Sequence, residues 1–102
     1  MVLLNVSEIQ GRQYELIKLV KGSAVRGTMT DIFSKWQVFT GNEMKGYTAI
    51  LEKLRDTATQ RMAEEAENIQ AHAVIGVVYS ATQIMPGTVE IIVYGTAVRF
   101  ID

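Results

Sequence analysis

Side chains that could carry out chemistry are few in this chain, and they are scattered. The sequence contains a single histidine, His72, and no cysteine. A metal site needs several ligands of matching softness close together, and nucleophilic catalysis needs a hydroxyl or thiol beside an oriented base. The residues therefore identify no catalytic group, no metal ligand set and no cofactor. A site shared between subunits stays open, and its candidate residues are Asp31, Tyr47, His72 and Tyr79.

Several of these side chains also have a purely structural interpretation. His72 lies where a long helix should end, and a histidine there commonly satisfies the last carbonyls. Tyr79 could stack on an aromatic ligand, although such tyrosines more often cap a core with the hydroxyl in water. Arg26 and Arg99 could bind an anion together if their strands are neighbours. As charges at strand ends, we expect them simply to lie on the surface.

Two short segments of the sequence are almost the same. Residues 22–26 are Gly-Ser-Ala-Val-Arg, and residues 95–99 are Gly-Thr-Ala-Val-Arg. A glycine among β-favouring residues marks a bulge or a close approach to the backbone, so we expect the two segments side by side in one sheet. Gly22, Gly76 and Gly95 are predicted to make room for another layer. A helix or a second subunit occupies such room more often than a ligand does.

The apolar pattern predicts one strand, then two helices, then a hairpin. Residues 13–25 form a predicted strand that is apolar on both faces, and the spacing over residues 29–36 gives a short helix one apolar face. Asn42 can cap a longer helix over about residues 43–71. The two hairpin strands alternate apolar and polar residues, and the Pro-Gly pair at 86–87 between them fits a type II turn.

These elements predict a single α+β domain over residues 1–102. The order β-α-α-β-β favours a three-stranded sheet with helices on one face. The net charge of −1 argues against nucleic acid as a partner, and no apolar run reaches the length of a membrane span. The first residues do not have the pattern of a signal peptide, so we expect a cytoplasmic protein.

The second face of the predicted sheet has nothing in the chain to cover it. It would be apolar, and such a surface is large for a small monomer to leave in water. Closed rings or dimers are the usual way to bury one, so we expect a homo-oligomer. The residues assigned to this face are Leu16, Val20, Val74, Val78, Ile92, Tyr94, Val98 and Phe100.

Taken in order, these landmarks resemble the YbjQ family. The resemblance rests on residues 20–27 (Val-Lys-Gly-Ser-Ala-Val-Arg-Gly), on the Gly-Tyr pair at 46–47, on residues 71–77 (Ala-His-Ala-Val-Ile-Gly-Val) and on residues 93–98 (Val-Tyr-Gly-Thr-Ala-Val). Its members are small bacterial proteins of uncharacterised function that often carry a heavy-metal-binding label. The resemblance implies an α+β subunit that assembles into a homopentamer.

The chain departs from the family pattern in three motifs. Members usually have a Gly-Gly-Arg-Ser-Gly loop before the long helix, which residues 39–46 lack. The family stretch Gly-Ala-Asp/Asn-Ala-Val-Val-Gly corresponds to residues 70–76, with Gln70 in place of its first glycine. Acidic residues typically follow the second glycine, where residues 77–80 are Val-Val-Tyr-Ser.

The leading hypothesis is a non-enzymatic, ring-forming assembly whose subunit junctions could hold a small ligand. A metal-binding protein and an enzyme with an interfacial active site remain as alternatives. The partner expected from this hypothesis is a further copy of the same chain.

Overall fold

The structure is a computed structural model that describes residues 1–26, 42–85 and 88–102. The described elements are β1 (Val2–Leu3), β2 (Tyr14–Arg26), α2 (Asn42–Asn68), β3 (Ala73–Met85) and β4 (Thr88–Phe100). The α+β class is confirmed. The short helix predicted at residues 29–36 and the turn at 86–87 lie outside the described residues.

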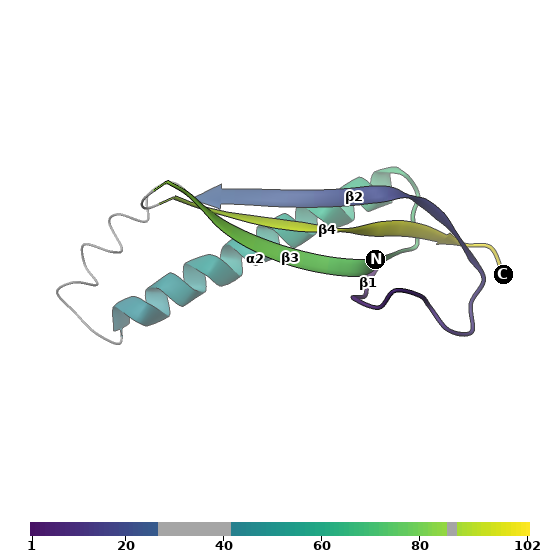
Figure 1. Ribbon diagram of the computed structural model, residues 1–102, viewed down its shortest axis with the longest axis horizontal. Helices are drawn as coiled ribbons and strands as arrows, with labels where there is room; N and C mark the ends of the chain where they lie inside the picture. Colours follow the sequence, from purple (N-terminus) through teal and green to yellow (C-terminus); the bar gives the residue numbers. More distant parts are fainter. Residues whose placement is uncertain (27–41, 86–87) are drawn as a thin grey trace.

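The sheet has four strands in the order β1-β3-β4-β2, and α2 lies against one face of it (Figure 1). The central strand β4 is antiparallel to both β2 and β3. The prediction of three strands is wrong because β1 pairs in parallel with the start of β3, Val2 with Ala73 and Leu3 with Val74. A two-residue strand is too short to show an alternation in the sequence.

The long helix begins close to its predicted start and ends at Asn68, earlier than expected. Its last turn is closed by two backbone bonds, from the Gln70 N–H to the Glu67 carbonyl (2.9 Å) and from the Ala71 N–H to the Ala66 carbonyl (3.0 Å). Gln70 adopts a left-handed conformation with φ of 64°. This is the Schellman arrangement, in which the residue after the helix is usually glycine.

The face of the sheet beneath α2 holds most of the core. Ala58, Met62 and Ala66 of the helix are fully buried against Val20 of β2 and Val93 of β4. Alanine at two of these positions keeps the helix backbone close to the strands, because its side chain extends little beyond the backbone. No helix in the described ranges is both long and apolar enough to cross a membrane.

Two β-bulges change which side chains face the helix. The pairing with β4 shifts between Leu16 and Lys18 in β2 and between Ile75 and Val78 in β3. An extra residue in one strand reverses the alternation of the residues beyond it. For this reason Val20 and Val74, which were predicted on the face away from the helices, are buried in the core under α2.

The N-terminal segment covers one end of the opposite face. Ala73, Ile75 and Val98 form a second buried cluster there, and Ile9 and Phe100 pack against it. The segment also continues the contact of β1 along β3, because the Val77 N–H donates to Leu4 and the Gly76 N–H donates to Val6. Val98 and Phe100, predicted to be uncovered, are therefore covered by the chain itself.

Candidate functional site: the outer face and the free edge

The face of the sheet turned away from α2, the outer face, carries exposed apolar side chains from three strands. Residues that pair directly across strands share a face, so Leu19 lies beside Thr96 and Val78 beside Tyr94 on this side. Leu16 is 67% exposed and Leu19 59% exposed. The outer patch, as we call this set, consists of Leu16, Leu19, Val25, Val78 and Tyr94.

The second half of β3 adjoins the outer patch and is open on both of its faces. Residues 78–84 are all exposed, including Tyr79 on the side of the helix. The helix lies mainly over β2 and β4, and among the described side chains a single hydrogen bond joins it to this half of β3, between the hydroxyls of Thr59 and Tyr79 at 2.8 Å. We call residues 78–84 the free edge, since within residues 1–26, 42–85 and 88–102 the only strand beyond β3 in the sheet is the short β1.

Close approach explains two of the three glycines that were predicted to make room for another layer. A Cβ placed on Gly22 would meet the Ala58 carbonyl oxygen and lie 2.5 Å from the Met62 nitrogen, so the occupant there is α2. A Cβ on Gly95 would lie 2.6 Å from Val74 Cγ1 in the neighbouring strand. Both contacts are made within one chain.

Gly76 does not fit the same explanation. Nothing lies within 4 Å of a Cβ built on it, so no close approach within the described chain accounts for this glycine. Its φ is 64°, and it lies in the bulge of β3. A glycine is required there because side-chain-bearing residues rarely adopt that conformation.

His72 lies between α2 and β3 and takes part in a contact that differs from the prediction. Its Nδ1 accepts a hydrogen bond from the Phe100 N–H at 2.9 Å, and the two rings stack with centroids 5.5 Å apart. The carbonyls directly after the helix are bound by Arg99 and not by His72, because the Arg99 guanidinium donates to Ile69 (3.0 Å) and Gln70 (3.2 Å). Nothing in the sequence pattern identified this role of Arg99.

The four ligand candidates do not form a common site in the described part of the chain. His72 and Tyr79 are seven residues apart on an extended segment, which separates them by roughly 20 Å at about 3.3 Å per residue. Asp31 lies outside the described residues. Tyr47 belongs to α2, but its side chain is not among those described.

Arg26 and Arg99 do not form an anion site together. Their strands are neighbours, as the repeated segments predicted, but the strands run antiparallel, so Arg26 pairs with Val89 and Arg99 with Glu15 at opposite ends of the sheet. Arg99 also forms an ion pair with Glu15 at 3.1 Å. The two similar segments therefore run in opposite directions, and their arginines lie at opposite ends of the strand pair.

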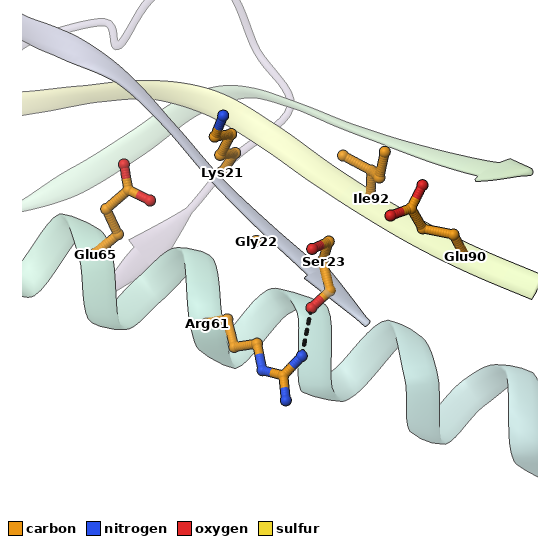
Figure 2. A pocket seen from close by; sticks show the side chains of 7 residues that line it. All are labelled: Lys21, Gly22, Ser23, Arg61, Glu65, Glu90 and Ile92. Carbon is orange, nitrogen blue, oxygen red and sulfur yellow. Dashed lines mark hydrogen bonds between the residues drawn. The ribbon is translucent and has the colours of Figure 1, made fainter. Parts of the chain in front are cut away.

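A shallow groove of about 440 Å³ runs over the edge of β2, where strand and helix meet (Figure 2). Arg61 reaches up from α2 and donates to the Ser23 carbonyl at 2.7 Å. Basic and acidic side chains both line the groove, with Lys21 and Arg61 opposed by Glu65 and Glu90. One chain alone therefore offers it no excess charge of either sign for selecting an ionic ligand.

The described residues do not fit a metal site within one chain. No three His, Asp or Glu side chains among them come close enough together to hold a metal ion. The sequence has no cysteine to offer a soft ligand. The Nδ1 atom of His72 already accepts a backbone N–H, which leaves only its Nε2 for a ligand.

Relatives are found along the whole length of the chain. The profile of the YbjQ family, described as "Putative heavy-metal-binding", matches residues 1–101. A UPF0145 protein from Clostridium novyi is 41% identical over 103 residues, covering 99% of this chain and 100% of that protein. A UPF0145 protein from Thermus thermophilus is 42% identical over 90 residues, covering 86% of this chain and 79% of that protein.

One solved structure shares the fold at low sequence identity. It is a protein of unknown function from the DUF74 family of Pediococcus pentosaceus, with a TM-score of 0.74 and 16% identity. The superposition covers 99% of this chain and 98% of that one. With a family profile and close relatives that span the chain, the protein belongs to the YbjQ family, whose relatives carry the name UPF0145.

Proposed function

We propose that this protein is a non-enzymatic homo-oligomer, a ring of five copies, in which the outer patch of each subunit is buried against the next. The observation that carries the proposal is the outer patch itself. Large apolar side chains exposed together on one face of a sheet are typical of interaction surfaces. The number five follows from the family resemblance, and self-association follows from the surface.

A closed ring uses two different surfaces on every subunit. Its contacts are heterologous, which means that each subunit binds its two neighbours through two different surfaces. The outer patch and the free edge are adjacent but chemically distinct surfaces on this chain, one made by side chains and the other by a strand. Their presence together supports a contact in which one surface of each subunit packs against a different surface of its neighbour.

The groove at the edge of β2 is where a small ligand would bind in such a ring. As a shallow groove of mixed charge, it has little to hold a ligand in one chain. A neighbouring subunit packed on the outer face would stand beside Lys21 and Ser23, which lie on that face next to Leu19 and Val25. Closing a groove excludes water and strengthens its polar contacts.

Charge introduced into the outer patch tests this proposal. Leu19→Lys places an ammonium in the proposed contact, and Gln60→Lys places the same charge on the exposed surface of α2. Burial of an unpaired charge costs about 3–5 kcal/mol, so Leu19→Lys should raise the dissociation constant at least about 100-fold. Light scattering at micromolar concentration should give a monomer for Leu19→Lys and an unchanged oligomer for Gln60→Lys.

Two results would contradict the proposal. A wild-type protein that is monomeric at all accessible concentrations would remove the oligomer. A Leu19→Lys variant that keeps the wild-type mass at the same dilution would show that the outer patch is not the contact.

A further inference from the structure

A second, smaller hollow of about 210 Å³ lies between the last residues of β2 and the middle of α2. It shares Arg61 with the groove at the edge of β2. We call it the basic hollow, because Arg26, Lys53 and Arg61 line it and no carboxylate of the described residues does so. Since the whole chain has a net charge of −1, this gathering of positive charge is a local feature.

The three cations of the basic hollow are not neutralised by the part of the chain that the structure describes. The ion pairs there are Arg12 with Asp102 and Arg99 with Glu15, at the other end of β2. A cleft lined by charges of one sign raises the local concentration of ligands of the opposite sign. The basic hollow is therefore suited to an anion, unlike the groove beside it, where Glu65 and Glu90 oppose the cations.

A threonine lies midway between two of these cations. Lys53, Thr57 and Arg61 are spaced by four residues, so they form a row along one face of α2. Thr57 is about 6 Å along the helix axis from each of the other two, within reach of both long side chains. Its own side chain is half-buried, and its hydroxyl is hydrogen-bonded to no described residue, whereas the Thr59 hydroxyl is bonded to Arg55 and Tyr79.

The two arginines approach the basic hollow from different elements. Arg61 of α2 donates through one nitrogen to the Ser23 carbonyl at 2.7 Å (Figure 2), which holds the side chain against β2 and leaves its other N–H groups available. Arg26 follows the buried Ala24 by two residues, so it lies on the face of β2 turned toward the helix. Guanidinium groups bind phosphate oxygens through paired N–H donors.

The rest of the lining is mostly apolar. Ala24 and Leu54 are 3% and 8% exposed, and Ile50 is half-buried. An ion alone would leave these side chains without a partner, whereas a ligand with an apolar part would cover them. Pockets for drug-sized ligands have volumes of about 300–1,000 Å³, so the volume of the basic hollow favours a smaller molecule.

We propose that the basic hollow binds the phosphate group of a small phosphorylated molecule, whose apolar part packs on Ile50 and Leu54. A phosphate monoester carries a charge of about −1.5 to −2 and three strong acceptor oxygens, which matches three cations and the Thr57 hydroxyl. This inference goes beyond the proposed ring and does not depend on it, because all of these lining residues belong to one chain.

Calorimetric titration at constant ionic strength tests the proposal with two probes, inorganic phosphate and phenyl phosphate. We expect one site per chain. Phenyl phosphate should bind at least about tenfold more tightly than inorganic phosphate, because its ring removes apolar surface of the basic hollow from water. The comparison also distinguishes an organic phosphate from free phosphate as the ligand.

Three variants locate the site. Lys53→Gln should weaken the binding of phenyl phosphate at least about tenfold. Lys18→Gln is the matched control, because it removes the same charge from an exposed lysine of β2 that does not line the basic hollow, and it should bind as the wild type does. Thr57→Val removes a hydroxyl without changing the net charge and should weaken binding about fivefold. Circular dichroism of all three should match the wild type.

Each of the other outcomes contradicts a defined part of the proposal. A wild-type protein that binds neither probe overturns it. Equal losses for Lys53→Gln and Lys18→Gln also overturn it, since only the net charge of the chain would then matter. Equal affinities for the two probes contradict the apolar part of the ligand. A monomeric protein that binds phenyl phosphate would support this inference and contradict the ring.

Discussion

The two halves of β3 each contain four apolar side chains but have very different surroundings. The first half, Ala73 to Val77, has β1 and the N-terminal segment along its edge, and Ala73, Val74 and Ile75 are buried. The second half, residues 78–84, is exposed throughout. Both halves pair with the same strand, β4. The difference therefore lies in how far the N-terminal segment reaches, because in the described part of the chain it follows the edge of only the first half of β3.

The boundary between the two halves is the bulge at Gly76. Its positive φ allows the strand to change the face on which its side chains alternate. Before the bulge, Ile75 faces the N-terminal segment, and beyond it Val78 faces solvent on the same side. The apolar side chains on this side of β3 are therefore covered by the N-terminal segment before the bulge and exposed to solvent after it.

The largest loss in the free energy of unfolding should come from adding a side chain at Gly95, which packs against the covered half of β3. Gly95→Val would place a branched side chain where a Cβ already lies 2.6 Å from Val74 Cγ1 and 2.9 Å from the Ile75 carbonyl. Overpacking of this kind costs about 1–3 kcal/mol, and we expect the upper end because a backbone atom must move. Ala81→Val, in the open half, should stay within about 0.5 kcal/mol. Urea unfolding measures both, and equal effects would contradict the comparison.

A stabilising change is expected where the covered half of β3 is joined to α2. Gln70→Gly relieves a left-handed conformation that costs a side-chain-bearing residue roughly 1–2 kcal/mol, less the greater freedom of glycine in the unfolded chain. The free energy of unfolding should rise by about 0.5–1 kcal/mol. Gln70→Ala keeps the strained conformation and should show no gain. A Gln70→Gly variant that melts below the wild type would contradict this account of the helix end.

A smaller loss of stability is expected in the open half, at the hydrogen bond that joins Tyr79 to Thr59 of the helix. Tyr79→Phe removes the hydroxyl that lies 2.8 Å from the Thr59 hydroxyl. Since Tyr79 is 45% exposed, water replaces much of this bond, and the cost should be about 0.5 kcal/mol. Thermal unfolding should therefore give a small shift for Tyr79→Phe and a somewhat larger one for Thr59→Val, which also removes the hydrogen bond from the Thr59 hydroxyl to the Arg55 carbonyl at 2.6 Å. A loss above about 2 kcal/mol would mean that this half is held more firmly than its exposure indicates.

The smallest effect should be the contribution of Asp102 to the pH dependence of the free energy of unfolding. Desolvation raises the pKa of Asp102, but the hydrogen bond from the Gln13 N–H and the charge of Arg12 outweigh it, so its pKa lies below the ordinary value of an aspartate. A lowered pKa in the folded state contributes stability above the unfolded value and loses it as the pH falls through the folded one. Wild type and Asp102→Asn should therefore differ slightly at neutral pH and converge at strongly acidic pH. A difference that grows as the pH falls would contradict this sign.

Much of the fold could be predicted from the sequence because its signals are local. The start of α2 near Asn42 follows from a cap and a helical stripe, and the hairpin follows from two alternating runs of residues. Met85 at the end of one strand pairs with Thr88 at the start of the other. The contacts at Gly22 and Gly95 follow from glycine among β-favouring residues, since a missing Cβ has few other uses in a strand.

The rest depended on features that leave little trace in sequence. Two bulges reversed the alternation, so that Val20 and Val74 moved from the expected outer face into the core. The bond from Arg99 to the end of α2 joins residues 30 positions apart. The cover provided by the N-terminal segment depends on Ile9 and Leu4, which lie in a stretch with no clear periodicity. The free edge could be recognised only once the reach of that segment was known.

Native mass spectrometry of the wild-type protein, purified without added metal, tests the central claim most directly. The account predicts a species of five times the 11.4 kDa subunit mass. A reproducible additional mass on that species would identify the class of any ligand or metal held at the subunit junctions. A protein that remains at 11.4 kDa under the same conditions would contradict the account, because the outer patch and the free edge would then be stable in water without a partner.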